Sequence, residues 1–380
     1  MTATTDATTV TERVEAVVAG GGPAGAVAAL VLARAGRRVL LVDRRTGESA
    51  TAAFKVGETL PPAARPLLHD LGLWPAFAAD AHLRCPGTCA SWGSEALHGR
   101  SHLYDPHGHG WHLDRIRFDT FLRDAAVAAG ARLREADVVS RNVTDAGERR
   151  LLVREQGRLK EVSCDWVVDA TGRRAVIGRR LAHRSRQDRL VAVFALFSRR
   201  LPGRAGDDSE LRTLVEAAPN GWWYTARVPA GRVVAHLTDV DLADTVLRTA
   251  EGFLGEVART RHIRARVDGY DPAHAPPPHW TAAHGLRLSP PAGPGWLATG
   301  DAAIAFDPLS SQGILTALHT GAAAGATVDR CLADATDSLA AYGAFLDRIA
   351  NAYQRNRTEA YSQEQRWRGH AFWRRRQSWA

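Results

Sequence analysis

A glycine-rich segment near the start of the chain, Gly20-Gly21-Gly22-Pro23-Ala24-Gly25, has the spacing of a phosphate-binding turn. Gly20 allows a tight turn, Gly22 lets the backbone approach a pyrophosphate, and Gly25 lets a helix pack close to a strand. Asp43 follows after about 20 residues, where an acidic side chain accepts hydrogen bonds from ribose hydroxyls, and the adjacent Arg44 can lie along an adenosine. The pattern predicts that a dinucleotide binds to Gly20, Gly22, Pro23, Ala24, Gly25, Asp43 and Arg44.

A second segment, near the other end of the chain, decides which dinucleotide is bound. Asp301 follows a predicted strand over 296–299 and can accept a hydrogen bond from a ribitol hydroxyl. Gln312, Gly313 and Ile314 open an Ala-rich helix predicted to end near Leu332, and its N-terminus can stabilise negative charge on a reduced isoalloxazine. Because a protein that binds only NAD has no need of this second contact, the two segments together predict FAD.

Alternating strands and helices must position these residues. Apolar runs predict strands over 15–19, 38–42, 133–139 and 166–169, with helices over 23–35 and 118–129 and a hairpin over 149–162. From about 181 to 280 the pattern changes to alternating β segments over 190–197, 221–228 and 232–238, which predicts an antiparallel sheet laid over the flavin. Residues 272–278 are Pro-rich and are predicted to be a linker.

The last part of the chain is predicted to be a polar helix over 338–365, followed by an aromatic and basic tail. The tail contains Trp367, Phe372, Trp373 and Trp379. We expect it to cap the core, and docking of a partner is the alternative because aromatic residues with arginine are favoured at interfaces.

Composition limits the class of protein. The 380 residues suit two interleaved domains, and 45% of them are hydrophobic. Residues 1–10 are polar and predicted to be disordered, and no apolar run is long enough to span a membrane. Four cysteines are too few for a disulfide framework, which favours a cytoplasmic protein.

The formal charge of +8 is concentrated in arginine clusters over 173–189 and 374–376. A solvated surface is the simplest interpretation, and docking of an acidic peptide or carrier protein is the alternative. Nucleic acid is not expected as a partner because no recognition module accompanies the charge. No metal is predicted, because no standard zinc spacing occurs among Cys85, Cys89, His102, His107, His109 and His112.

Segments along nearly the whole chain resemble the flavoprotein monooxygenases of the p-hydroxybenzoate hydroxylase and flavin-dependent halogenase superfamily. More narrowly, the chain is similar to the group that modifies tryptophan in precursors of quinone-cofactor amine oxidases and dehydrogenases. The matching segments are the glycine-rich turn, 55–62, 111–119, Asp169-Ala170-Thr171-Gly172, 221–224, Thr238-Asp239, the segment after Gly300, and 372–376.

The resemblance implies an α/β fold in which a Rossmann-like FAD-binding domain of the glutathione reductase type is interleaved with an antiparallel β-sheet substrate domain and followed by a C-terminal helical segment. The FAD-binding domain is expected over 11–80, 112–180 and 280–335, the substrate domain over 81–111 and 181–279, and a helical cap over 336–380. By the same resemblance, Arg115, Val138, Thr171 and Gly172 contact FAD.

Three departures from the family narrow the activity. The chain has Asp169-Ala170-Thr171-Gly172 in place of the doubled-glycine motif tied to direct NADPH use, so either NAD(P)H or a separate flavin reductase supplies electrons. Residues 85–97 contain no lysine, whereas halogenases carry an essential lysine there. Residues 221–227 depart from the halogenase Trp-x-Trp-x-Ile-Pro motif.

The resemblance therefore implies an FAD-dependent monooxygenase that hydroxylates an electron-rich ring, such as an indole or a tryptophan on a peptide or protein, through a flavin C4a-hydroperoxide. The cofactor carries the difficult step, while the protein excludes water and moves one proton. Lys55, Glu58 and Asp307 are the candidate catalytic residues, although Lys55 can instead form an ion pair and Asp307 can cap a helix. Trp222, Trp223 and Tyr224 are expected to line the substrate pocket, although aromatic strand residues are more often part of a core.

Three other activities remain open at this stage. A flavin-dependent halogenase is the alternative within the family. An FAD-dependent oxidase or dehydrogenase of a natural-product intermediate would release peroxide without transferring oxygen. A flavin-binding protein that only chaperones a precursor would show no turnover.

Overall fold

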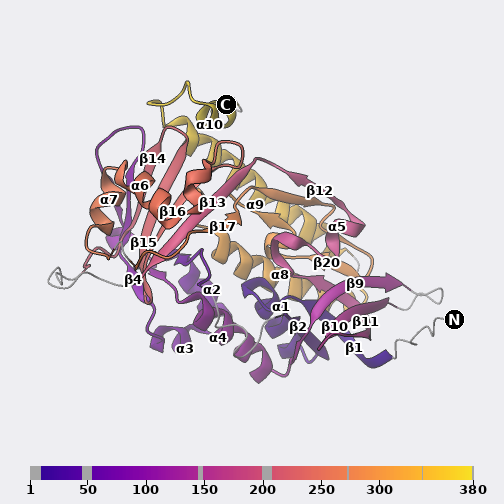
Figure 1. Ribbon diagram of the computed structural model, residues 1–380. Coiled ribbons are helices and arrows are strands. Elements are labelled where there is room, and N and C mark those ends of the chain that lie inside the picture. The colour runs from indigo at the N-terminus through magenta and orange to yellow at the C-terminus, as the bar shows by residue number, and fades with distance from the viewer. Residues whose placement is uncertain are drawn as a thin grey trace.

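The protein is represented by a computed structural model that describes residues 10–44, 54–143, 149–198, 208–271, 274–335 and 337–378. Two large sheets form the body of the molecule, and the C-terminal helices lie beside both of them (Figure 1). The disorder predicted for residues 1–9, two residues of the predicted linker (272 and 273) and the tail residue Trp379 lie outside the described residues. Val10, also predicted to be disordered, begins the first strand.

The first large sheet has eight strands and carries the glycine-rich turn. Its main path runs β19-β20-β11-β1-β2-β8, with β10 beside β11 and β9 beside β10. Strands β1, β2, β8, β11 and β20 are parallel where they pair, which brings the carboxyl ends of β1, β11 and β20 to one edge. The strands are β1 (Val10–Ala19), β2 (Val39–Asp43), β8 (Arg132–Glu135), β9 (Asp137–Val143), β10 (Arg149–Glu155), β11 (Arg158–Asp169), β19 (Ala292–Gly293) and β20 (Trp296–Ala298).

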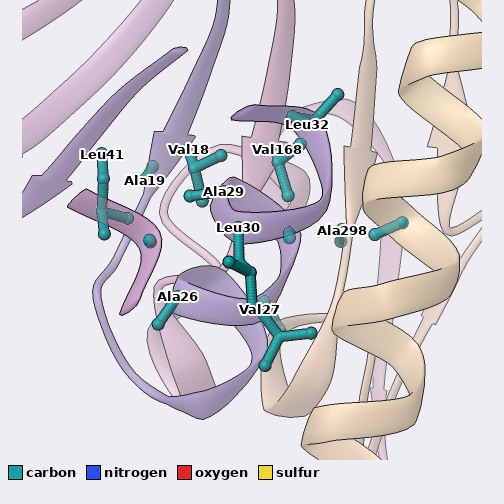
Figure 2. Close-up of a cluster of buried hydrophobic side chains, with 14 of the residues drawn as sticks. Val18, Ala19, Ala26, Val27, Ala29, Leu30, Leu32, Leu41, Val168 and Ala298 are labelled. Atoms are coloured by element: carbon teal, nitrogen blue, oxygen red, sulfur yellow. The ribbon is translucent and has the colours of Figure 1, made fainter. Parts of the chain in front are cut away.

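Helices pack on this sheet through a buried apolar core. Helix α1 (Pro23–Arg34) contacts both α4 (Arg115–Ala128) and α8 (Gly313–Leu332). Figure 2 shows Ala29 of α1 beside Val18 of β1 and Leu32 of α1 beside Val168 of β11, and all four residues are fully buried. Small side chains along α1 allow this close packing, which fixes the start of the helix at the end of β1.

The second large sheet has seven strands in the order β17-β13-β16-β15-β14-β5-β6. All pairs are antiparallel except β14 with β5. Helices α6 (Ala250–Ala258) and α7 (His262–Val267) contribute to a hydrophobic cluster on one face (Figure 1). The strands are β5 (Gly87–Ser91), β6 (His98–Ser101), β13 (Leu190–Phe197), β14 (Thr213–Ala218), β15 (Gly221–Val228), β16 (Gly231–Asp239) and β17 (His279–Ala282).

Two small sheets connect these bodies. One pairs β3 (Thr59–Leu60), β7 (Gly110–His112) and β4 (Leu83–Cys85), and the other pairs β12 (His183–Arg186), β18 (Leu286–Ser289) and β21 (Ile304–Ala305). The short helices α2 (Ala64–Asp70), α3 (Trp74–Ala79) and α5 (Gly178–Leu181) complete the connections.

The C-terminal helices tie the two cores together. The first half of α9 (Ser338–Ser362) contributes Tyr342 and Leu346 to the core of the first sheet, and its last turn places Tyr361 in the core of the second. Helix α10 (Ala371–Gln377) buries Phe372 and Trp373 completely in that second core. The described part of the tail therefore packs as a cap on the core.

The architecture agrees with the predicted fold class: an α/β domain with a largely parallel sheet, a second, mostly antiparallel sheet and C-terminal helices. Two element boundaries were wrong. The strand predicted over 133–139 is two strands, β8 and β9, because the chain leaves β2 at Ala136 to pair with β10 instead. The second strand of the predicted hairpin and the strand predicted over 166–169 are one continuous strand, β11.

Candidate active site

A cavity of about 420 Å³ lies where the two sheets meet. Its walls come from the start of α1, the segment over 55–59, strands β15 and β17, and the loop before α8. Both ends of the chain therefore contribute to one site, as the two sequence segments predict. The predicted site residues that line it are Gly22, Pro23, Ala24, Lys55, Glu58, Arg115, Gly172, Trp222, Tyr224, Asp301, Asp307, Gly313 and Ile314.

The glycine-rich turn forms one corner of the cavity. Gly20 has φ +108°, and a Cβ there would lie 2.2 Å from the carbonyl oxygen of Ala170, so only glycine fits between β1 and β11. The N-terminus of α1 has no side-chain cap, and a Cβ on Gly22 would meet no atom within 4 Å. Unpaired N–H groups beside open space at a helix N-terminus suit a phosphate group.

The residues that were predicted to contact adenosine do not line the cavity and lie beyond this corner. Asp43 ends β2, and its Oδ2 lies 3.4 Å from Nη1 of Arg123. The backbone N–H of Arg44 donates to Oδ1 of Asp43 at 2.7 Å, and Val138 is buried on β9. Arg123 also lies 3.4 Å from the carbonyl oxygen of Gly21, so it links the turn to the acidic residue. No motif in the sequence indicated this role for Arg123.

The turn after β11 is organised by Asp169. Its carboxylate accepts hydrogen bonds from the Thr171 N–H and hydroxyl at 3.0 and 2.6 Å, and from the Ile177 and Gly178 N–H groups at 2.9 and 2.7 Å. Four donors hold the turn rigidly, so that Gly172 reaches the cavity while Thr171 faces Asp169.

A second helix N-terminus meets the cavity on the opposite side. Gly313 and Ile314 of α8 line it, no side chain caps α8, and Gln312 immediately precedes the helix. Asp301 lies nearby, 3.6 Å from Nε of Arg173. Although its side chain is 42% exposed, Asp301 lines the cavity, and enclosure there raises the pKa of its carboxyl.

Lys55 is held in an ion-paired cluster at the cavity wall. Its ammonium group pairs with the buried carboxylate of Asp119, which also accepts from Nη2 of Arg115 at 3.2 Å. Nη1 of Arg115 donates to the carbonyl oxygen of Gly57 at 2.6 Å. Enclosure by the cavity, and next the positive charge of Arg115, lower the pKa of Lys55. The ion pair considered as an alternative for Lys55 is therefore present.

Glu58 and Tyr224 form the polar centre of the cavity wall. Oε2 of Glu58 accepts from the Tyr224 hydroxyl at 3.3 Å and from the Gly57 N–H at 3.0 Å. Glu58 is only 1% exposed, and burial raises the pKa of its carboxyl. A buried carboxylate with a raised pKa is a stronger base than an exposed one, so the arrangement can take up a proton.

Asp307 is part of a buried network behind the cavity. Its Oδ1 accepts from the Leu309 N–H at 3.0 Å, as a helix-capping side chain does. Its Oδ2 accepts from the Tyr361 hydroxyl at 2.7 Å, and Tyr361 in turn accepts from the indole Nε1 of Trp222 at 3.1 Å. These contacts favour the capping interpretation, and Tyr361, more than 50 residues away in sequence, was not predicted.

The three aromatic residues predicted for the pocket do not all lie on one side of β15. Trp222 and Tyr224 line the cavity. Trp223 faces the opposite side, where its ring stacks on His236 at 4.4 Å and contacts Phe253 of α6. This corrects the prediction for Trp223, because successive strand side chains point to opposite faces.

Among the described residues, no group of three or more His, Cys, Asp or Glu side chains is arranged to bind a metal ion. No helix in the described part of the chain combines the length and apolar character of a membrane span.

The glycine corner and the N-terminus of α1 suit the pyrophosphate of FAD, and the N-terminus of α8 suits its isoalloxazine ring. The comparisons with known proteins agree with this assignment. The sequence profile of the FAD binding domain family matches residues 13–339. The protein is thus an FAD-dependent oxidoreductase, and it belongs to this family within the flavin monooxygenase and halogenase superfamily.

Three known proteins are similar to this chain. The chain is 30% identical to the putative FAD-dependent oxidoreductase LodB of Marinomonas mediterranea, covering 97% of this chain and 98% of that protein. The peptidyl tryptophan dihydroxylase QhpG, essential for tryptophylquinone cofactor biogenesis, has a TM-score of 0.77 at 25% identity, covering 96% of this chain and 79% of that one. The myxobacterial chondrochloren halogenase CndH shares the fold, with a TM-score of 0.83 at 22% identity, covering 96% and 86%.

Proposed function

We propose that this protein is an FAD-dependent monooxygenase that hydroxylates an electron-rich aromatic ring, with indole-like rings, including tryptophan on a peptide or protein, as its substrate class. The observation that carries the proposal is the buried Glu58–Tyr224 pair in the wall of a cavity that also borders both uncapped helix N-termini. A ring that gains a hydroxyl group must lose a proton, and Glu58 is placed to accept it.

When bound and reduced, FAD supplies the activation of molecular oxygen. The chain's own residues bind and orient the reactants around it. We assign the pyrophosphate to Gly22, Pro23 and Ala24 at the N-terminus of α1, and the negative charge of the reduced ring to Gly313 and Ile314 at the N-terminus of α8.

We assign the substrate ring to the side of the cavity formed by the second sheet. Ala192, Val215 and Leu237 offer an apolar wall there, next to the rings of Trp222 and Tyr224. An apolar wall disfavours bound water and favours a flat aromatic ring over a charged substrate. The similarity to QhpG, a peptidyl tryptophan dihydroxylase, supports a tryptophan carried on a peptide.

We assign Lys55 and Asp307 to positioning. Lys55 and Arg115 hold Asp119 and the 55–59 segment against the cavity, which keeps Glu58 in place. Asp307 holds the loop before α8 through Leu309. Electrons come from NAD(P)H, either directly or through a separate flavin reductase as a partner.

Halogenation is the second candidate, because relatives with this fold include the halogenase CndH. The chain has only two lysines, Lys55 and Lys160. Lys160 lies on β11 and pairs with Glu155, and Lys55 is held by Asp119. Lys55 is therefore the one lysine that borders the cavity, and its ion pair favours hydroxylation over halogenation.

The test is to reduce the FAD-loaded protein with NADH or NADPH, or with dithionite, and to mix it with ¹⁸O₂ and indole or tryptophan-containing peptides. Mass spectrometry should find ¹⁸O in the ring of the product. Bromide and chloride are added in parallel reactions. A brominated or chlorinated product would establish the halogenase instead, and peroxide equal to the oxygen consumed, with no ¹⁸O in any ring, would exclude both.

A further inference from the structure

A line of readily oxidised rings leads away from the cavity through the second core. Trp222 lines the cavity, and its Nε1 donates to the hydroxyl of Tyr361 at 3.1 Å. Behind Tyr361 lie Trp92 and Trp373, with ring centroids 5.8 and 5.9 Å from the phenol ring. Each ring is therefore close to van der Waals contact with the next.

The same line continues to the protein surface. Trp92 and Trp373 are 5.2 Å apart, and Trp367 lies 6.2 Å beyond Trp373. Trp222, Tyr361 and Trp373 are at most 1% exposed, whereas Trp92 and Trp367 are partly exposed. Trp222, Tyr361, Trp373, Trp92 and Trp367 are called the aromatic relay below.

Tyr361 has the proton acceptor that the indoles of the relay lack. Its hydroxyl donates to Oδ2 of Asp307 at 2.7 Å, and Asp307 is completely buried. The indole N–H groups of Trp373 and Trp92 donate to the carbonyl oxygens of Ala218 and Ala360 at 2.9 and 2.7 Å. A carboxylate can accept the phenolic proton, whereas a backbone carbonyl cannot accept an indole proton. Oxidation of the relay can therefore produce a neutral radical at Tyr361.

Burial raises the pKa of Asp307, and this effect exceeds the lowering by the positive charge of Arg357. The carboxylate of Asp307 is therefore a better proton acceptor.

The composition of the chain agrees with a role for aromatic rings in oxidation. It has 11 tryptophans but a single methionine, Met1, so the thioether groups that absorb oxidants in many proteins are nearly absent.

We propose that the aromatic relay carries single electrons from the surface to the cavity and so protects the site from oxidants formed there. This role rests on the oxygen chemistry of the proposed function but not on its substrate. A one-electron oxidant derived from O₂ takes an electron from Trp222. Tyr361 returns that electron to Trp222 and gives its phenolic proton to Asp307.

The electron lost by Tyr361 is replaced from outside. Trp373 passes an electron to Tyr361, Trp367 or Trp92 passes one to Trp373, and a thiol or ascorbate in solution reduces the exposed indole. Asp307 returns the proton to Tyr361. One electron leaves the external reductant and one reaches the oxidant, so the side chains end unchanged.

The test uses the FAD-loaded protein in its oxidised form, with light-excited FAD as the one-electron oxidant and electron paramagnetic resonance as the readout. The wild type should show a tyrosyl radical. Tyr361→Phe should lose most of that signal, and Asp307→Asn should reduce it because an amide is not a proton acceptor. The matched control is Tyr342→Phe, which removes a similarly buried phenol whose hydroxyl donates to the carbonyl oxygen of Ala298.

A second measurement follows oxidative damage. The protein is reduced and exposed repeatedly to O₂ without substrate, and oxidised residues are mapped by mass spectrometry. Oxidation should concentrate on Trp367 and Trp92, decrease severalfold with ascorbate, and move to Trp222 in Tyr361→Phe. Trp367→Phe, a change at the partly exposed end, should shift damage to Trp92 without affecting the radical at Tyr361.

Two results would overturn the relay: an equal radical signal in Tyr361→Phe and wild type, or an unchanged map of oxidised residues in that variant. Retained FAD absorbance in each variant shows that it has folded. The light-driven experiment needs no oxygen transfer, so a radical at Tyr361 together with no ¹⁸O in any product would remove the proposed function and keep the relay.

Discussion

Replacing Gly20 with alanine tests whether the corner between β1 and β11 determines FAD binding. The new Cβ would lie 2.2 Å from the oxygen and 2.7 Å from the carbon of the Ala170 carbonyl group. Both are backbone atoms, so no flexible side chain can move aside. The end of β1 and the turn after β11 must separate by roughly 1 Å to reach normal contact.

The size of the effect follows from two contributions. Alanine in a left-handed conformation costs about 1–2 kcal/mol, which affects the free energy of unfolding. The separation also moves Gly22 and Gly172, which line the cavity on either side of the corner. Losing one hydrogen bond to a charged phosphate costs about 1.5–3 kcal/mol, which corresponds to a dissociation constant for FAD that is about 10- to 100-fold higher.

Gly36→Ala is the matched control, because Gly36 also has a left-handed backbone, with φ +80°, but a Cβ there would meet no atom within 4 Å. In urea unfolding of the apoproteins, Gly36→Ala should lose only the cost of the left-handed backbone, and Gly20→Ala should lose more because of the backbone clash. Only Gly20→Ala should lose FAD affinity in a flavin fluorescence titration. If Gly20→Ala binds FAD as tightly as the wild type, or if Gly36→Ala weakens binding equally, the steric argument fails.

Glu58→Gln keeps the hydrogen-bond acceptor but removes the base, so the rate of ring hydroxylation should fall by about 10²–10⁴-fold, measured as ¹⁸O-labelled product. Because burial raises the pKa of Glu58, the folded state binds its proton more tightly than the unfolded chain, and the wild type loses stability as the pH rises through the raised pKa. Glu58→Gln should therefore gain stability over the wild type towards neutral pH and match it in acid; urea midpoints that differ equally at every pH would contradict this. Arg376→Met removes the buried partner of Asp239 (Nη2 to Oδ1, 2.7 Å) and leaves this carboxylate dependent on the partly exposed Arg375, so it should cost up to about 3–5 kcal/mol in urea unfolding. Arg375→Met, at a side chain that is 39% exposed, should cost at most about 1 kcal/mol, and equal losses would show that burial does not set the difference.

The FAD-binding elements were predictable because their signals are local. Strand β1, the glycine turn, helix α1 and strand β2 follow each other within 34 residues. A Cβ on Gly20 or Gly25 would collide with backbone atoms, whereas Gly22 faces open space. The prediction that Trp223 lines the pocket was wrong although its signal is also local, since the alternation along β15 assigns Trp223 to the face opposite Trp222 and Tyr224.

The residues behind the cavity were not predictable in this way. Tyr361 meets Trp222 across 139 positions of sequence, and Arg123 meets Gly21 across 102. Nothing in the periodicity of α9 distinguishes Tyr361 from any other buried helical residue. Such contacts are set by how the C-terminal helix crosses the second sheet, which depends on the packing of the whole core.

The arginine clusters show that the charge of a surface also cannot be predicted from the sequence alone. Counting residues suggested a surface for an acidic partner over 173–189 and 374–376. In the structure, Arg173 donates to the carbonyl oxygens of His284 and Phe306, Arg184 donates to the carbonyl oxygen of Arg173, and Arg376 is buried against Asp239. These guanidinium groups bind backbone and carboxylate groups inside the protein, so they are not free to bind an acidic partner. For these three groups the formal charge therefore overstates the attraction for an acidic partner, whereas Arg174, Arg179, Arg180, Arg186 and Arg189 are exposed. The number of arginines in a cluster does not show how many of them face solvent.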